Sequence, residues 1–430
     1  MQTVSILVIS ALVVSLTACS RPSPPEQSTE SIGLDRGCVV AMTANHGGED
    51  GIAKLQQDLR GRRAPARAAE QLGYRFISRA RLTNDPGFYK VAEQAAACLE
   101  SIVPGEPAAL LLRGHVLHQM HRFGEAEAIA RRLVGMREFV LDLGLLGDVL
   151  MEQGRVADAA EAYQKMIDLK PFYQSYTRAA HLRWVRGDLP GAIELMNSAV
   201  KSASLRDRES VAWAYSRLAC YDLQRGRLAE AGRMADVSLQ YVPDYAAALL
   251  ARGRVELAQK KYTAAVETLE RAAQRNPLPE YQWTLADALR LLNRNEEAAA
   301  LEKQLVRDGL ASDPRTLALY LSTRGDDGGR AVDLARREMG NRRDVFTLDA
   351  LAWALASTGQ VREASTLIDR ALAEGTQDGR LFLHAAVIAA AGGRSADARR
   401  WARKAHTLRF TLLPSELGVL RKGIVPSPRI

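Results

Sequence analysis

A period of about 34 residues recurs along this sequence and limits its possible folds more than any other feature. Two adjacent copies lie within residues 110–171. The first has Gly114, Leu117, Ala126 and Leu133, and the second repeats those intervals at Gly147, Leu150, Ala159 and Met166. Followed along the chain, one small residue marks ten copies, at Ala92, Ala126, Ala159, Ala192, Ala231, Ala265, Ala298, Ala331, Ala364 and Ala398. A period of this length accommodates two helices and a turn, so the pattern predicts stacked helical hairpins, each too small to bury its own apolar face.

The residue types within each copy resemble the tetratricopeptide repeat family over residues 66–408. The third copy supplies Leu143, Gly147, Leu150, Gly154, Ala159, Tyr163, Met166 and Pro171. Small residues have a physical role in this motif, because two helices approach closely only where one of them carries Gly or Ala. The resemblance implies an all-α fold, an α-solenoid in which about ten helical hairpins form a right-handed superhelix with a concave groove.

Three places depart from the regular pattern. Residues 325–329 (Gly-Asp-Asp-Gly-Gly) crowd the turn of the copy around Ala331, which matches the motif least well. The first copy has a long turn over residues 83–87, and residues 201–207 account for the one long step, from Ala192 to Ala231. We interpret the two insertions as flexible loops, with partner contacts as the alternative.

The N-terminus has a different character. Residues 6–14 are almost wholly apolar, a length that suits the core of a signal peptide and is too short for an ordinary membrane-spanning helix. Leu16, Thr17, Ala18 and Cys19 then resemble the lipobox of bacterial lipoproteins. The resemblance implies cleavage before Cys19 and attachment of acyl chains (palmitate among them) to that residue. The leader departs from the family in having no Lys or Arg before its apolar core.

These features predict five segments. Residues 1–18 are a lipoprotein signal peptide, and residues 19–31 are a Pro-rich flexible tether. Residues 32–65 are an N-terminal cap region that includes a short helix over residues 52–60. Residues 66–408 form the superhelix, and residues 409–430 form a C-terminal capping helix and tail. In the lipoprotein family that the lipobox resembles, an aspartate after the lipidated cysteine tends to retain a protein on the inner membrane. The resemblance therefore implies that Ser20 favours the outer membrane, with the tether holding the repeats on the periplasmic side.

Charge and cysteine content add weaker constraints. The formal net charge of +8 is spread over 430 residues, mostly as scattered arginine, which favours solvated helix faces and no nucleic-acid partner. Besides Cys19, the chain has Cys38, Cys98 and Cys220. Their spacing matches no metal motif. Cys38 and Cys98 can pair in an oxidising compartment, which would leave Cys220 free, but the sequence does not decide this.

The sequence predicts a binding protein without cofactor or metal. It contains none of the HExxH, GxSxG, GxxxxGK[ST] or GxGxxG motifs, so no catalytic residue is assigned. His115, His118 and His121 form a cluster; the first two are assigned to the groove and His121 to the turn, with a metal site or surface decoration as the alternatives. Steps of three residues turn successive side chains by about 60°, so three histidines on one helix converge poorly on an ion.

In the repeat family, residues at fixed positions around the small residue of the first helix face the hollow. Four of the five tryptophans lie at such positions. Aromatic anchors beside hydrogen-bonding charges are how concave surfaces hold peptides. The alternative is that the tryptophans pack between repeats. The predicted groove residues are His115, His118, Asp148, His181, Trp184, Trp213, Arg217, Trp283, Asp287, Arg290, Tyr320, Asp349 and Trp353.

The leading hypothesis is therefore a lipid-anchored scaffold of the cell envelope that binds a protein or peptide along its groove, for example in assembling an envelope or secretion complex. One alternative is an envelope enzyme with an unrecognised active site in the groove. The other is a soluble cytoplasmic adaptor with an unused leader. Some family members bind a free C-terminal carboxylate with a pair of Lys and Asn, and this sequence shows no such pair at the predicted groove positions. The sequence does not address the oligomeric state.

Overall fold

The computed structural model describes residues 35–45 and 48–422. The signal peptide, the lipobox with Cys19, the tether and residues 423–430 lie outside these ranges. Within the described residues no helix is both long and apolar enough to cross a membrane.

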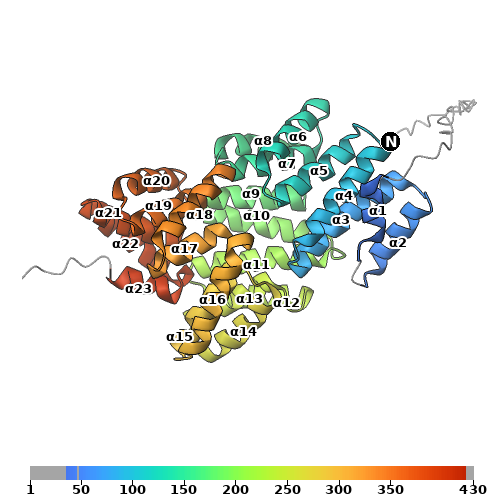
Figure 1. The fold of residues 1–430 in the computed structure, drawn as a ribbon. Helices are drawn as coiled ribbons and strands as arrows, with labels where there is room; N and C mark the ends of the chain where they lie inside the picture. The colour runs from blue at the N-terminus through green and yellow to red at the C-terminus, as the bar shows by residue number, and fades with distance from the viewer. Residues whose placement is uncertain (1–34, 46–47, 423–430) are drawn as a thin grey trace, which may run out of the picture. The chain divides into compact units, whose positions relative to one another are not determined.

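All regular structure in the described part of the chain is helical, which confirms the predicted all-α solenoid (Figure 1). Two short helices, α1 (Arg36–Thr43) and α2 (Asp50–Arg60), come first. Ten hairpins follow: α3 (Pro65–Thr83) with α4 (Gly87–Ile102), α5 (Pro107–Gln119) with α6 (Phe123–Met136), α7 (Val140–Glu152) with α8 (Val156–Leu169), α9 (Tyr173–Val185) with α10 (Leu189–Ser202), α11 (Arg208–Gln224) with α12 (Leu228–Tyr241), α13 (Ala246–Ala258) with α14 (Tyr262–Arg275), α15 (Pro279–Leu291) with α16 (Asn295–Ser312), α17 (Pro314–Arg324) with α18 (Gly328–Asn341), α19 (Val345–Ser357) with α20 (Val361–Ala373), and α21 (Gly379–Ala391) with α22 (Ser395–Thr407). A 3-10 turn, η1 (Arg409–Thr411), and α23 (Pro414–Lys422) end the described chain.

The turn between the two helices of each hairpin contains a residue with positive φ. These residues are Asn84, His121, Gly154, Gly187, Gly226, Lys260, Asn293, Gly325, Gly359 and Gly393. The left-handed conformation ends the first helix and redirects the chain, and glycine adopts it at least cost. The weakly matching copy around Ala331 follows the same design. Gly325 closes α17, and the Asp327 side chain accepts a hydrogen bond from the Arg330 N–H (3.1 Å) at the start of α18.

The small residues of the repeat are required by packing. A Cβ atom added to Gly114 would lie 2.4 Å from Cδ2 of Leu145, and one added to Gly147 would lie 2.2 Å from the ring of Tyr163. Neighbouring side chains therefore fill the space that the missing Cβ leaves, as the sequence pattern predicted. Ala126 and Ala159 in the partner helices are likewise fully buried.

The N-terminal cap region packs on the first hairpin. Cys38 of α1 forms a disulfide with Cys98 of α4, across a Cα–Cα distance of 4.5 Å. The sequence had left this pairing open. In α2, the Gln56 side-chain amide donates to the carbonyl oxygens of Ala41 (3.0 Å) and Ala44 (2.9 Å) and so ties the two short helices together. Cys220 is the one free cysteine among the described residues.

Distant hairpins also contact one another along a row of hydrogen bonds that we call the seam, formed by the pairs Glu152–Arg343, Val185–Thr376 and Gln224–Gln377. The Arg343 N–H donates to the Glu152 carbonyl (2.9 Å), the Thr376 hydroxyl donates to the Val185 carbonyl, and the Gln224 amide donates to the Gln377 carbonyl. Members of the last two pairs are separated by 191 and 153 residues. Solenoid repeats ordinarily touch only their neighbours. In this chain the third to fifth hairpins instead meet the loops around the ninth and tenth.

The segment after the tenth hairpin joins distant repeats as well. Leu412, which lies between η1 and α23, packs with Phe382 and Leu383 of α21. In addition, α23 contacts α15 and α17 of the seventh and eighth hairpins. The Ser415 hydroxyl and N–H both donate to Oδ2 of Asp287 (2.6 and 2.8 Å), and Trp283 Nε1 donates to Ser415 Oγ (3.1 Å).

The Asp287 contact gives stability a specific pH dependence. Burial raises the pKa of Asp287 to about 6, although the Ser415 donors and Arg324 act in the opposite direction. The folded chain then binds this proton more tightly than the unfolded chain, whose aspartate pKa is about 3.9, so the contribution of Asp287 to stability falls as the pH rises from about 4 to 6.

We expect Asp287→Asn to remove this effect, measured as the difference in urea unfolding free energy between variant and wild type at pH 4.5, 5.5 and 7. The difference should move in favour of the variant with rising pH. A constant difference would contradict this account of Asp287.

Candidate functional site

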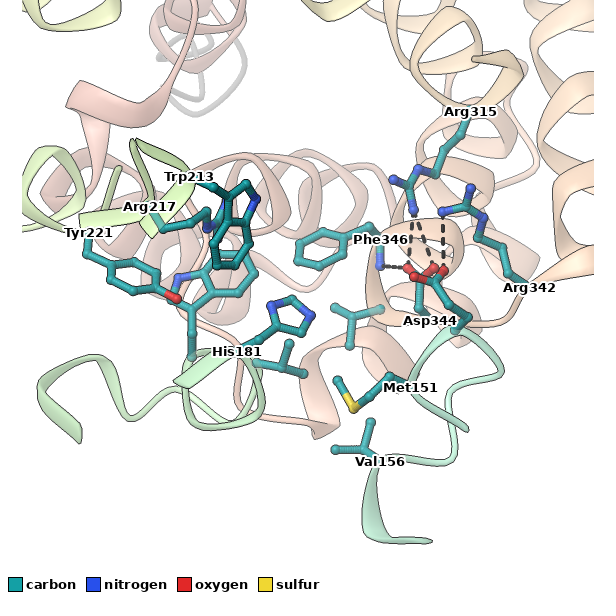
Figure 2. Close-up of a pocket in the computed structure, with 14 residues that line it drawn as sticks. Met151, Val156, His181, Trp213, Arg217, Tyr221, Arg315, Arg342, Asp344 and Phe346 are labelled. Atoms are coloured by element: carbon teal, nitrogen blue, oxygen red, sulfur yellow. Dashed lines mark hydrogen bonds and ion pairs between the residues drawn. The ribbon is translucent and has the colours of Figure 1, made fainter. Parts of the chain in front are cut away.

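A cavity of about 450 Å³ lies among five hairpins of the solenoid, the third to fifth and the eighth and ninth (Figure 2). Its residues come from the end of α7 and the start of α8, from α9, from α11, from α17, and from the loop between α18 and α19 with the start of α19. The lining residues are Met151, Glu152, Val156, His181, Trp184, Val185, Trp213, Arg217, Tyr221, Arg315, Arg342, Asp344, Val345 and Phe346. Its volume is within the range of ordinary ligand-binding pockets.

One side of the cavity is aromatic. The Trp184 ring stacks on Phe346 (centroids 5.6 Å apart) and on His181 (5.8 Å). The centroid of the Tyr221 ring lies 6.5 Å from that of Trp184. Trp184 Nε1 donates to the Gln224 side-chain oxygen (2.8 Å), and Gln224 itself belongs to the seam. The aromatic wall, by which we mean His181, Trp184, Trp213, Tyr221 and Phe346, is therefore held in place by a contact between distant hairpins.

The opposite side is charged, and its charged residues form ion pairs with one another. Figure 2 shows Arg315, Arg342 and Asp344 together across the cavity from Trp213 and Tyr221. Arg315 pairs with Asp344 (3.3 Å), and Arg342 pairs with Glu152 (3.3 Å). Asp344 also accepts hydrogen bonds from the N–H groups of Phe346 (2.7 Å) and Thr347 (2.9 Å) at the start of α19. Burial raises the pKa of Glu152, against the influence of Arg342.

Arg217 differs from these two arginines. Its guanidinium carbon lies 5.6 Å from the centre of the Trp184 ring and 5.4 Å from that of Tyr221, a cation–π arrangement. The ionisable groups that raise its pKa, against the effect of burial, are Tyr221 and Cys220, and no carboxylate is among them. Burial first, and then the charge of Arg217, lower the pKa of His181 to about 4, so this histidine is uncharged at neutral pH.

Two further cavities adjoin the first. One of about 390 Å³ shares Trp184, Arg217, Tyr221, Arg315 and Phe346 with it and extends to Glu280, Asp349, Asp378 and Arg380. Another of about 600 Å³ shares Arg315 and Arg342 and extends to Tyr89, His121 and Leu278. The hollow that the sequence predicted is thus a set of adjoining interior spaces, with Arg315 at the boundary of all three.

Four of the predicted groove residues line the first cavity together: His181, Trp184, Trp213 and Arg217. Asp349 lines the second. These five residues lie on α9, α11 and α19, which contribute the helix faces that the repeat register placed toward the hollow.

Other predicted groove residues are enclosed, which corrects their assignment. Trp283 is fully buried against Tyr320 and Ser415, and Asp287 (2 % exposed) is bound by Ser415. Trp353 donates to the Thr323 hydroxyl (3.0 Å) and stacks on His384, whose Nδ1 lies 2.9 Å from Asp349. The register was consistent with an inward direction for these side chains. The C-terminal segment and the neighbouring hairpins occupy the space that they would have faced.

The remaining predicted residues lie away from the first cavity. Arg290 pairs with Glu302 on the next helix. Asp148 accepts hydrogen bonds from Arg178 (2.8 Å) and from the Tyr163 hydroxyl (2.8 Å). Burial would raise the pKa of Asp148, but Arg178 outweighs it and the pKa is lowered.

The three clustered histidines have separate surroundings. His115 lies beside the Tyr74 ring, His118 meets the edge of Phe123, and His121 lies at the turn, in the third cavity, beside Arg342 (3.2 Å). Burial is the main cause that lowers the pKa of His115 and of His121 to about 4. Within the described ranges, no group of three or more His, Cys, Asp or Glu side chains is placed to hold a metal ion.

Several cavity residues were missed by sequence reasoning: Met151, Glu152, Val156, Val185, Tyr221, Arg315, Arg342, Asp344 and Val345. Tyr221 lies two residues after Ala219, the small residue of its helix, and the repeat pattern does not direct that position toward the hollow. Arg342 and Asp344 lie in a loop beside the seam. The approach of Arg342 to Glu152 depends on a contact across 190 residues, which has no local sequence signature.

The described chain is thus a helical-repeat protein with adjoining cavities inside its repeats. Residues 111–174, 216–278 and 250–314 match the tetratricopeptide repeat family, so the chain contains tetratricopeptide repeats in these segments, as its sequence predicted. No curated protein matches the sequence.

Three solved structures are similar to the chain in fold. A human IFIT1 dimer with PPP-AAAA is 12% identical, with a TM-score of 0.47, over 87% of this chain and 93% of that one. Yeast Tom70 is 13% identical, with a TM-score of 0.37, over 86% and 93%. A tetratricopeptide repeat protein from Parabacteroides merdae is 15% identical, with a TM-score of 0.33, over 58% and 97%.

Proposed function

We propose that this protein is a scaffold that binds a segment of a partner protein in its interior cavity. The observation that carries the proposal is the cavity itself: an aromatic wall fixed by the seam and a half-buried arginine without a carboxylate partner. Buried aromatic and arginine side chains contribute most to protein binding when they are held rigidly in a concave site. The tetratricopeptide repeats support this class of function, because such repeats generally bind proteins or peptides.

The charged groups around the cavity favour binding over catalysis. Glu152 and Asp344 are each engaged by an arginine, and Asp287, one of the predicted groove carboxylates, is bound by Ser415. We therefore keep the proposal of a non-catalytic scaffold.

Affinity capture with variants tests the binding site. We expect Trp213→Ala to reduce the recovery of specific partners about tenfold or more, which is the effect of losing an aromatic anchor worth about 1.4 kcal/mol or more. Trp401→Ala is the matched control, because Trp401 packs on Phe382 of the tenth hairpin, outside the cavity. Equal loss in both variants, or none in Trp213→Ala, would remove the cavity from the proposed function.

We also propose that Cys19 anchors the chain by lipid to the bacterial envelope, facing the periplasm. The proposal rests on the residues from Leu16 to Cys19 and on the Pro-rich tether after them, which lie outside the described residues. Two or more acyl chains bind a bilayer durably, whereas one does so only weakly. We expect Cys19→Ala to move the protein from the membrane fraction to the soluble fraction and to abolish incorporation of a palmitate analogue. Retention in the membrane without the cysteine would contradict lipid anchoring.

A further inference from the structure

The cavity contains two hydrogen-bond donors that no carboxylate of the described residues engages. Arg217 is one: among these residues it forms no ion pair with a carboxylate, and its guanidinium lies against the rings of Trp184 and Tyr221. Tyr221 is the other. Its side chain is 1% exposed and lines both the first and the second cavity, yet its hydroxyl donates to no acceptor within the described residues. A buried hydroxyl without an acceptor is unfavourable by about 1–3 kcal/mol, so its presence points to a group that arrives from outside.

These two donors lie together. The Arg217 guanidinium is 5.4 Å from the centre of the Tyr221 ring, and each residue shifts the pKa of the other. The arginines on the opposite side, Arg315 and Arg342, already have carboxylate partners. The cavity therefore has one position where a negative charge from a ligand would find both a positive charge and a neutral donor.

The surroundings of this position are apolar. Trp184 lies under Arg217, and Phe346 stacks on Trp184. A ligand that reaches Arg217 must place uncharged, preferably aromatic or aliphatic, groups against this wall. The adjoining second cavity shares Arg217 and Tyr221, so the donors lie between two spaces. This arrangement suits a chain that passes through the interior better than one that ends there.

We infer that the cavity recognises a peptide segment in which an acidic side chain, held by Arg217 and Tyr221, is flanked by aromatic or aliphatic residues. The inference rests on the proposed function and adds the chemistry of the ligand. The carboxylate would accept hydrogen bonds from the guanidinium and from the tyrosine hydroxyl, and the flanking side chains would pack on Trp184, Trp213 and Phe346.

Synthetic peptides test this inference directly. The probe is a fluorescein-labelled peptide, blocked at its C-terminus as an amide, with a central Phe-Glu-Leu between glycines. Its comparison is the same peptide with Phe-Gln-Leu, and a third arm carries Phe-Gln-Leu with a free C-terminal carboxylate. By fluorescence anisotropy we expect the Glu peptide to bind the full-length protein about tenfold or more tightly than the Gln peptide, since hydrogen bonds to charged groups contribute about 1.5–3 kcal/mol.

Two variants assign the preference to the proposed donors. In Arg217→Gln the ratio of Glu to Gln affinity should fall to about one, and in Tyr221→Phe, which keeps the ring, it should fall several-fold. Arg233→Gln is the matched control, because Arg233 is exposed on α12 of the same hairpin and pairs with Glu230. Its ratio should equal that of the wild type. Tyr221→Phe keeps the test decisive if Arg217→Gln folds poorly.

Three results would overturn the inference: equal affinity of the wild type for the Glu and Gln peptides, no binding of either, or a preference that survives in both variants. A stronger preference for the free C-terminus would assign the site to chain ends and would also overturn it. These outcomes are separate from the capture experiment. If Trp213→Ala loses partners while the Glu peptide shows no advantage, the cavity binds proteins by another chemistry and the proposed function stands.

Discussion

Replacing Arg380 by glutamine should destabilise the fold by about 3–5 kcal/mol, because it leaves the buried carboxylate of Glu416 without its only cation among the described residues and leaves Glu280 with Arg254 alone. Arg380 extends from α21 between Glu280 of α15 and Glu416 of α23, and its guanidinium lies 5.1 Å from the centre of the Trp283 ring. Glu416 is fully buried, and the pKa of Glu280 is lowered to about 2 because Arg380 and Arg254 outweigh the effect of its burial. The measurement is urea unfolding at pH 7, followed by tryptophan fluorescence.

The control is Arg394→Gln, which breaks a pair with Asp369 whose two side chains are 34% and 50% exposed. Such pairs contribute about 0–1 kcal/mol, so this variant should unfold close to the wild type. Combining Arg380→Gln with Glu416→Gln should recover part of the loss, because one uncompensated charge is then removed and the Glu416 oxygen that accepts from the Leu413 N–H (2.7 Å) is still supplied by glutamine. Equal midpoints for Arg380→Gln and Arg394→Gln would show that the α15–α21–α23 junction does not hold the solenoid.

Gly187→Ala should destabilise the protein by about 2–4 kcal/mol. About 1–2 kcal/mol of this is the cost of placing alanine in the left-handed backbone conformation, and overpacking against the seam accounts for the rest. Gly187 has a φ of +79°, and a Cβ added there would lie 2.3 Å from the carbonyl oxygen of Gly375. That oxygen belongs to a backbone and cannot turn aside as a flexible side chain would. The two loops must therefore separate, and with them the contact between Val185 and Thr376.

Gly359→Ala separates the two causes. Gly359 lies at the equivalent turn of the ninth hairpin with a φ of +78°, and no heavy atom beyond its own neighbourhood lies within 4 Å of the added Cβ. This control should lose only the backbone part, about 1–2 kcal/mol. Because the seam also positions Trp184 through Gln224, Gly187→Ala should weaken peptide binding while Gly359→Ala should not. Identical unfolding and binding in the two variants would mean that the seam contributes nothing to either.

The repeat was readable from the sequence because every hairpin solves the same local problem. Small residues such as Gly114 and Gly147 are needed wherever two helices approach closely, and a turn residue is needed in every unit. The period, the ten hairpins and the helical class therefore followed from the spacing alone. The copy around Ala331 was harder to recognise only because its turn carries several glycines, although Gly325 and Asp327 perform the usual tasks of ending one helix and starting the next.

The candidate site was predicted less completely. The register placed His181, Trp184 and Trp213 toward the hollow, and these three side chains line one cavity together with Arg217, since an inward direction is a property of one helix. It also placed Trp283 and Trp353 in an open groove, whereas both are buried. The same inward direction leads to a cavity in one hairpin and to the core in another, depending on what fills the hollow at that level.

Sequence by itself determined the parts of this protein that depend on neighbours within one repeat: the helices, their turns and the direction in which each side chain leaves its helix. Only the tertiary structure decided which inward side chains meet open space. That outcome depends on Ser415 reaching Asp287 and on Arg343 reaching Glu152, contacts between segments that lie several repeats apart in the chain. The physical reason is that close packing of neighbouring helices is specified by residue size at each repeat, whereas contacts between distant turns depend on the accumulated geometry of all the repeats between them.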